Sequence, residues 1–113
     1  MRDLVILGST GSIGVQALEL IAANPGKFRV VAITSAGNNP ATIIEQANKF
    51  NVGVVGTIHN AEAIAQALPG VTIIDGKDAA AEVASITCDV VLNAITGSVG
   101  LAATLAALKL VIV

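Results

Sequence analysis

Short apolar runs alternate with longer amphipathic segments along the chain, and turn residues separate them. Continuous apolar runs are typical of parallel strands buried on both faces, whereas apolar residues spaced three and four apart indicate helices. The expected strands are residues 4–7, 28–34, 52–57, 71–74, 89–93 and 110–113. The expected helices are residues 12–24, 40–50, 61–68, 78–86 and 99–108.

This alternation of strand and helix predicts parallel βαβ units with right-handed crossovers. We therefore expect an α/β fold, a Rossmann-like doubly wound parallel sheet of about six strands. Residues 1–113 would form a single three-layer domain. The first strand should lie between the second and the fifth, with a ligand crevice at its carboxyl end. The strand at residues 71–74 is expected at an outer edge.

The first strand runs directly into Gly8-Ser9-Thr10-Gly11-Ser12-Ile13-Gly14, and a helical pattern begins inside that segment. Gly8 allows a sharp turn, Gly11 allows a diphosphate to approach the backbone, and Gly14 allows the helix to pack on the strand. Free N–H groups at the helix start then face the phosphates. The spacing G-x-x-G-x-x-G is a variant of the usual fingerprint, so a glycine-rich turn without a ligand is the alternative. The position between strand and helix favours dinucleotide binding.

The end of the second strand bears on the choice of cofactor. An Asp or Glu there usually holds the ribose 2′-hydroxyl of NAD, but the sequence reads Thr34-Ser35-Ala36. A missing carboxylate permits a 2′-phosphate, and Ser35, Asn38 and Asn39 can donate hydrogen bonds to it. The pattern therefore favours NADP over NAD. The alternative is an ordinary polar loop in which Asn39 is the N-cap of the next helix and Pro40 its first residue.

Composition narrows the function classes. The chain has 113 residues, of which 54% are hydrophobic and 12% charged, with a net charge of −2. No basic patch favours nucleic acid, and a single cysteine fits a reducing compartment. No signal peptide or membrane-spanning segment is expected. We therefore expect a cytoplasmic protein that binds neither nucleic acid nor a membrane.

Candidate catalytic residues are few, and none forms a convincing set. His59 is the only histidine and is expected at the surface. Cys88 precedes the fifth strand and is interpreted as a small buried hydrophobe. The carboxylates Asp75, Asp78 and Glu82 suit a turn and the first turn of a helix without any metal. The sequence therefore predicts no catalytic residue and no metal ligand.

Four segments in a fixed order carry a family resemblance. They are the glycine segment 8–14, Asn24-Pro25 followed by Phe28-Arg29-Val30-Val31-Ala32, Val91-Leu92-Asn93-Ala94-Ile95-Thr96-Gly97, and Thr104-Leu105-Ala106-Ala107-Leu108. Together they resemble 1-deoxy-D-xylulose 5-phosphate reductoisomerase. The resemblance implies an oxidoreductase that uses NADPH and a divalent metal, Mg or Mn. It implies conversion of 1-deoxy-D-xylulose 5-phosphate to 2-C-methyl-D-erythritol 4-phosphate in the non-mevalonate pathway of isoprenoid biosynthesis.

The resemblance also assigns site residues. The cofactor-binding positions that it implies are Thr10, Gly11, Ser12 and Ile13 in the glycine segment and Gly37 and Asn39 in the loop after the second strand. Asn38 is added as a cofactor-binding residue because its side chain can donate to the 2′-phosphate. Asn38 stands where members of the family often have Lys or Arg, which implies a weaker hold on the 2′-phosphate.

The family continues into an Asn-Lys-Glu segment and a catalytic domain with the metal carboxylates, neither of which is present in this sequence. We therefore expect the N-terminal cofactor domain of an enzyme that is a homodimer at full length and acts on a small phosphorylated sugar. This segment alone should bind NADPH but should bind no metal and catalyse no reaction. The alternatives are a non-catalytic NADP-sensing module and the cofactor domain of another reductase, such as a semialdehyde dehydrogenase.

Overall fold

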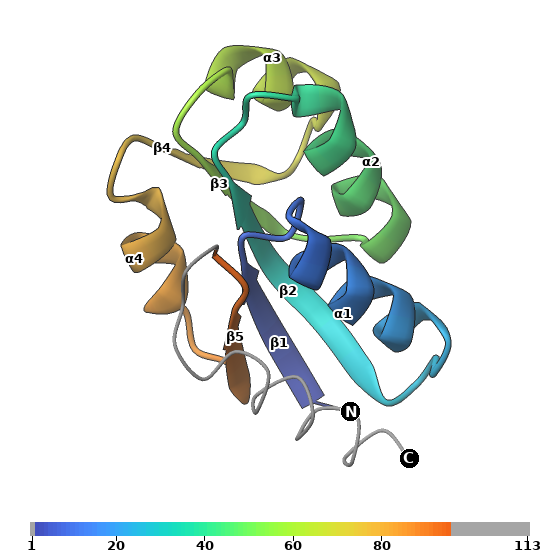
Figure 1. Cartoon of the computed structure of the whole chain (residues 1–113). Coiled ribbons are helices and arrows are strands. Elements are labelled where there is room, and N and C mark those ends of the chain that lie inside the picture. The colour runs from blue at the N-terminus through green and yellow to red at the C-terminus, as the bar shows by residue number, and fades with distance from the viewer. Residues whose placement is uncertain (1, 96–113) are drawn as a thin grey trace.

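The computed structural model describes residues 2–95, which form a parallel five-stranded sheet with helices on both faces (Figure 1). The expected α/β fold is confirmed. The strands are β1 (Arg2–Leu7), β2 (Phe28–Ser35), β3 (Val54–Thr57), β4 (Thr72–Asp75) and β5 (Val90–Asn93). The helices are α1 (Ser12–Ala22), α2 (Pro40–Phe50), α3 (Ala61–Ala67) and α4 (Ala79–Ala84). The helix expected at residues 99–108 and the strand expected at 110–113 lie outside the described residues.

The strand order is β4-β3-β2-β1-β5, so β1 lies between β2 and β5 as predicted, and β4 lies at an edge. The side chains of Leu4, Val5 and Ile6 are fully buried, which agrees with the continuous apolar run in the sequence. Because the strands are parallel, the segments that follow β1, β2 and β5 meet at one edge of the sheet.

The two faces of the sheet are covered unequally. Helices α1, α2 and α3 lie on one face and α4 lies on the other (Figure 1). The first face holds the larger apolar cluster, which includes Leu4, Ile6 and Ile33. The second face holds a smaller cluster around Val5, Ala32 and Val83. At Gly56 the sheet and α4 approach closely, because an added Cβ there would lie 2.9 Å from Val83 Cγ2.

Several element boundaries differ from the prediction, and local contacts explain two of them. Helix α1 ends at Ala22, two residues early, because the side-chain amide of Asn24 donates to the Leu20 carbonyl at 2.9 Å and closes the helix. Strand β3 begins at Val54 and not at Val52, whose N–H donates to Ala47 O at the end of α2.

The remaining differences are small and concern element ends. Strand β1 begins at Arg2 and not at Leu4, and strand β2 extends to Ser35. Strand β4 begins at Thr72 and includes Asp75, which was expected in a turn but pairs with Thr57. Helix α3 ends at Ala67, and α4 and β5 are shorter than predicted.

An ion pair joins the amino ends of β1 and β2. Both oxygens of Asp3 accept from the Arg29 guanidinium, at 2.9 and 3.0 Å. Hydrogen bonding and attraction from Arg29 lower the pKa of Asp3 and raise that of Arg29. The backbone N–H of Asp3 also donates to Asp89 Oδ2 at 2.7 Å. These contacts lie at the end of the sheet away from the glycine segment.

Candidate functional site

The turn after β1 is held by the end of β2. Gly8 has a φ of +80°, which only glycine adopts readily. Its N–H donates to both the carbonyl and the hydroxyl oxygen of Thr34, each at 3.1 Å. On its other side an added Cβ would lie 2.9 Å from the backbone nitrogen of Ile95. Gly8 is therefore enclosed between the segments that follow β2 and β5.

The three glycines of the segment have different surroundings. At Gly14 an added Cβ would overlap Gly8 O and lie 2.7 Å from Ser9 Cα, so the helix packs directly against the turn, as predicted. At Gly11 an added Cβ would meet only Gly8 O at 3.7 Å and Ala94 O at 4.0 Å, which are ordinary contacts. Contacts within the protein therefore require glycine at position 14, whereas at position 11 they leave space for a side chain or a ligand.

The amino end of α1 presents free backbone donors. Gly11 is the N-cap residue and supplies no side-chain acceptor. Among the hydrogen bonds found between residues 2–95, none uses the N–H of Ser12 or of Ile13. Ser12 is exposed and Ile13 is half-buried. Unpaired N–H groups and the positive end of the helix dipole suit an anion at this position.

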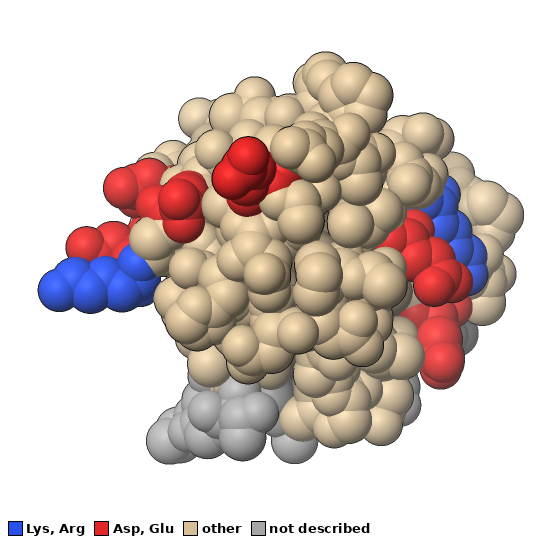
Figure 2. Space-filling model, turned by 90° about the horizontal axis from the view of Figure 1, so that it is seen from above, with Lys and Arg blue, Asp and Glu red and all other residues tan. Residues whose placement is uncertain are grey.

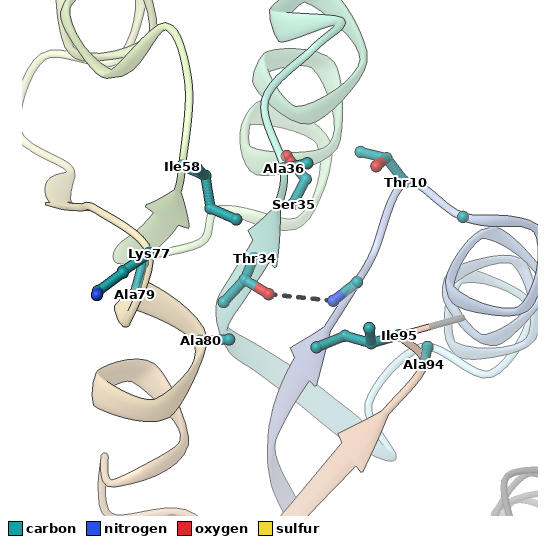
Figure 3. A pocket seen from close by; sticks show the side chains of 12 residues that line it. Thr10, Thr34, Ser35, Ala36, Ile58, Lys77, Ala79, Ala80, Ala94 and Ile95 are labelled. Carbon is teal, nitrogen blue, oxygen red and sulfur yellow. Dashed lines mark hydrogen bonds between the residues drawn. The ribbon is translucent and has the colours of Figure 1, made fainter. Parts of the chain in front are cut away.

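A cavity of about 270 Å³ opens beside this turn at the carboxyl ends of the strands (Figure 3). Thr10 and Gly11 line it from the glycine turn, and Ala94 and Ile95 line it from the segment after β5, so the predicted crevice is present. The further positions 96–98 that were expected there lie outside the described residues. The remaining lining residues are Gly8, Thr34, Ser35, Ala36, Ile58, Lys77, Ala79 and Ala80.

The loop between β2 and α2 is tied to the loop between β3 and α3. Gly37 is buried with a φ of +83°, and its N–H donates to Ser35 Oγ at 3.1 Å. Its carbonyl accepts from the side chain of Asn60 at 2.7 Å, and His59 N–H donates to Ala36 O at 2.9 Å. The backbone of the loop between β2 and α2 is therefore held in place by hydrogen bonds from the loop between β3 and α3.

Asn39 is the N-cap residue of α2 and Pro40 follows it directly, as the sequence predicts. Asn39 and Asn60 occupy the N-cap positions of α2 and α3, but neither side chain bonds to its own helix. Asn60 instead uses its amide to hold the Gly37 carbonyl. Asn38 and Asn39 are exposed, so their side chains are free to meet a ligand.

The predicted cofactor residues fall into two groups. Thr10 and Gly11 line the cavity, and Ser12 and Ile13 continue from them into the first turn of α1. Gly37, Asn38 and Asn39 do not line it but follow Ala36, which does.

Sequence reasoning missed the wall formed by Ile58, Lys77 and Ala80. These residues reach the cavity only because β3 pairs with β2, β4 pairs with β3 and α4 covers the second face (Figure 3). Local sequence carries no signal for this arrangement. In Figure 3 the ammonium group of Lys77 points away from Thr34 and the centre of the cavity.

The other candidate residues lie apart from this site. His59 is exposed, as expected, and enters the site only through its backbone. Cys88 precedes β5 at the amino edge of the sheet, but it is half-buried and not buried, and its thiol lies 3.6 Å from Val90 O. Within residues 2–95, no three His, Cys, Asp or Glu side chains are grouped closely enough to hold a metal ion.

Charge is sparse around the site. Figure 2 views the molecule from the side on which the strands end, and uncharged residues form most of the visible surface. Acidic and basic side chains stand mainly toward its margins. An anion bound here would therefore rely on backbone N–H groups and neutral polar side chains more than on ion pairs.

Comparison with known proteins identifies the family. The model of the family described as 1-deoxy-D-xylulose 5-phosphate reductoisomerase matches residues 4–111. The chain belongs to this family. It is 50% identical to the reductoisomerase of Corynebacterium efficiens over 94% of its own length and 29% of the relative's. It is 47% identical to that of Paenarthrobacter aurescens, over 95% of this chain and 30% of the relative. The chain thus spans less than a third of the length of these reductoisomerases.

Solved reductoisomerase structures share the fold. A reductoisomerase from Zymomonas mobilis in complex with NADPH matches with a TM-score of 0.73 and 29% identity, over 80% of this chain and 24% of that one. A second, in complex with NADPH, fosmidomycin and magnesium, matches with a TM-score of 0.79 and 31% identity, over 95% and 28%. Among the helices of residues 2–95, none has the length and apolar character needed to cross a membrane.

Proposed function

We propose that residues 1–113 form the NADPH-binding domain of a 1-deoxy-D-xylulose 5-phosphate reductoisomerase. The observation that carries the proposal is the start of α1. There the N–H groups of Ser12 and Ile13 bond to no other residue between 2 and 95, and Gly11 leaves the backbone open to an incoming phosphate. The likeness to reductoisomerases solved with NADPH supports the same ligand for this chain.

The two groups of predicted residues receive separate roles. Thr10, Ser12 and Ile13 bind the diphosphate through backbone N–H groups and the Thr10 side chain. Gly11, whose own N–H donates to Gly8 O at 3.3 Å, contributes the space for the phosphate. Gly37, Asn38 and Asn39 bind the adenosine ribose and its 2′-phosphate. The end of β2 supports this assignment because Thr34, Ser35 and Ala36 place no carboxylate beside that loop, and a carboxylate would repel the phosphate.

The chemistry of the whole protein is part of the proposal. It converts 1-deoxy-D-xylulose 5-phosphate to 2-C-methyl-D-erythritol 4-phosphate in the cytoplasm, as a homodimer. The substrate and a divalent metal, Mg or Mn, are bound by parts of the protein outside this segment. The segment supplies a positioned NADPH, whose nicotinamide donates the hydride.

Gly11→Val tests the diphosphate assignment. The added side chain occupies the space that a phosphate needs, so the Kd for NADPH should rise at least about a hundredfold, or about 2.7 kcal/mol. Calorimetric titration measures the affinity, and thermal unfolding checks that the fold persists. Gly53→Val is the matched control, because a Cβ at Gly53 also meets only an ordinary contact, at 3.9 Å from Val31 O.

Unchanged NADPH affinity in Gly11→Val would falsify the assignment. If the valine lowers stability, Gly11→Ala serves as the second variant, since its Cβ meets nothing closer than 3.7 Å in the ligand-free protein.

A further inference from the structure

Gln46, on α2, forms a reciprocal pair of hydrogen bonds with Ser9 in the glycine turn. Ser9 Oγ donates to Gln46 Oε1 at 2.7 Å, and Gln46 Nε2 donates to the Ser9 carbonyl at 2.9 Å. A backbone carbonyl only accepts hydrogen bonds, so the amide nitrogen of Gln46 must be the atom that faces it. The geometry therefore admits one orientation of the amide.

Ser9 is fully buried and held from several directions. Its N–H donates to Thr34 O at 2.9 Å, and its Cα is one of the backbone atoms against which Gly14 packs. Ser9 thus connects β2, α2 and the start of α1 at one point. A shift of Ser9 would move both the turn and the free N–H groups that follow it.

The bond from Gln46 to the Ser9 carbonyl also fixes the direction of the following backbone donor, the N–H of Thr10. No cis peptide bond occurs among the described residues, and in a planar trans peptide the C=O and N–H groups point in opposite directions. With its carbonyl directed at α2, the Ser9–Thr10 peptide must direct the Thr10 N–H away from α2. Thr10 lines the cavity, whereas Gln46 does not.

Resting on the proposed function, we infer that Gln46 is a positioning residue of the NADPH site. It holds the Ser9–Thr10 peptide so that the amides after it are directed at the diphosphate before the ligand arrives. It also sets the spacing between the two halves of the site, because α2 begins at Pro40, directly after the loop that contains Asn38 and Asn39. Gln46 acts through Ser9 and does not contact the cofactor.

The test compares two variants that remove different bonds. Gln46→Met keeps the length of the side chain but loses both bonds to Ser9. Ser9→Ala loses the hydroxyl contacts to Gln46 Oε1 and, at 3.4 Å, to Thr34 O, but keeps the bond that orients the peptide. The Kd for NADPH should rise about tenfold or more in Gln46→Met, as for loss of one hydrogen bond of ordinary strength. It should rise less than about threefold in Ser9→Ala. Asn48→Met, at an exposed position of α2, is the matched control and should bind as the wild type does.

Two measurements distinguish a positioning role of Gln46 from a general effect on stability. They are the melting temperature and backbone ¹⁵N relaxation recorded without NADPH. We expect Gln46→Met to increase motion at Thr10 to Ser12 without loosening the centre of α1. A lower melting temperature with unchanged Kd, or equal losses of affinity in Gln46→Met and Ser9→Ala, would overturn the inference. A wild-type protein that binds no NADPH overturns the proposed function instead. In that case only the relaxation data test the role of Gln46. Unchanged backbone motion at Thr10 to Ser12 in Gln46→Met would overturn that role.

Discussion

The glycine turn and the loop between β2 and α2 are the two halves of the proposed NADPH site, and they are built differently. In the turn, glycines at 8 and 14 are required by backbone contacts inside the protein, and the ligand-facing groups belong to the backbone. In the loop, Gly37 is fixed by Asn60, but the groups offered to a ligand are the exposed side chains of Asn38 and Asn39. The turn is therefore constrained by its own packing, whereas the loop can vary in charge without changing the fold.

A large loss of stability is expected from a substitution at Gly14. In Gly14→Ala the new Cβ would overlap Gly8 O and press on Ser9 Cα, both of which are backbone atoms with little room to move. We expect the free energy of unfolding to fall by on the order of 3 kcal/mol. Urea denaturation measures this, with Gly53→Ala as the control, because the same methyl there meets only an ordinary contact with Val31 O at 3.9 Å. Equal stability of the two variants would show that the turn does not depend on close packing of α1.

At Gly37 a substitution should harm both stability and binding. Gly37→Ala introduces backbone strain and also a clash with Thr57 Oγ1 and His59 O. Gly70 has nearly the same φ, +86°, but nothing within 4 Å of an added Cβ, so Gly70→Ala isolates the strain, about 1–2 kcal/mol. The additional decrease in the free energy of unfolding of Gly37→Ala, compared with Gly70→Ala, then measures the clash. Only Gly37→Ala should weaken NADPH binding. If both variants bind NADPH normally, the loop is not part of the site.

A change of charge in the loop should sharpen cofactor choice without affecting the fold. Asn38→Lys places a cation beside the proposed 2′-phosphate, so NADPH affinity should increase about three- to tenfold while NADH affinity stays constant. The gain should shrink as salt is added. Titrations with both cofactors measure the ratio, and Asn48→Lys on the exposed side of α2 controls for net charge. An equal gain for NADH would place the 2′-phosphate elsewhere.

The smallest effect is expected at the opposite end of the same strands. Arg29 lowers the pKa of Asp3 below its ordinary value of 3.8, so the pair stabilises the fold above that pH and loses its contribution as pH falls through the lowered value. Arg29→Gln should therefore be slightly less stable than wild type near neutral pH and converge with it in acid. Thermal unfolding from pH 7 to pH 2 measures this. NADPH affinity should not change. A change would contradict the conclusion that the ion pair at the amino ends of the strands is independent of the site at their carboxyl ends.

The part of the site that the sequence predicts is the part made by neighbouring residues. Strand, glycine turn and helix start follow one another between residues 4 and 14, so their order alone indicates the turn and the roles of Gly8 and Gly14. The central position of β1 also follows, because a continuous apolar run requires cover on both faces.

The rest depends on contacts between distant segments. Gln46 and Ser9 are 37 residues apart, and Asn60 and Gly37 are 23 apart, so neither pair has a local signature. Asn60 shows the difficulty directly: at an N-cap position its own helix is the expected partner, yet a carbonyl from another loop takes the bond. Lys77 lines the cavity from the turn between β4 and α4, and its place there depends on the order of the strands in the sheet.

The strand order also bears on how the protein emerges from the ribosome. β1 pairs with β2, the next strand to be made, but its other edge is covered by β5, which is made about 80 residues after β1. At about 5–20 residues per second, that edge stays open for roughly 4 to 16 seconds. During this interval a highly apolar strand offers unpaired backbone groups to any neighbouring nascent chain, so slow translation of the segment before Val90 should favour aggregation.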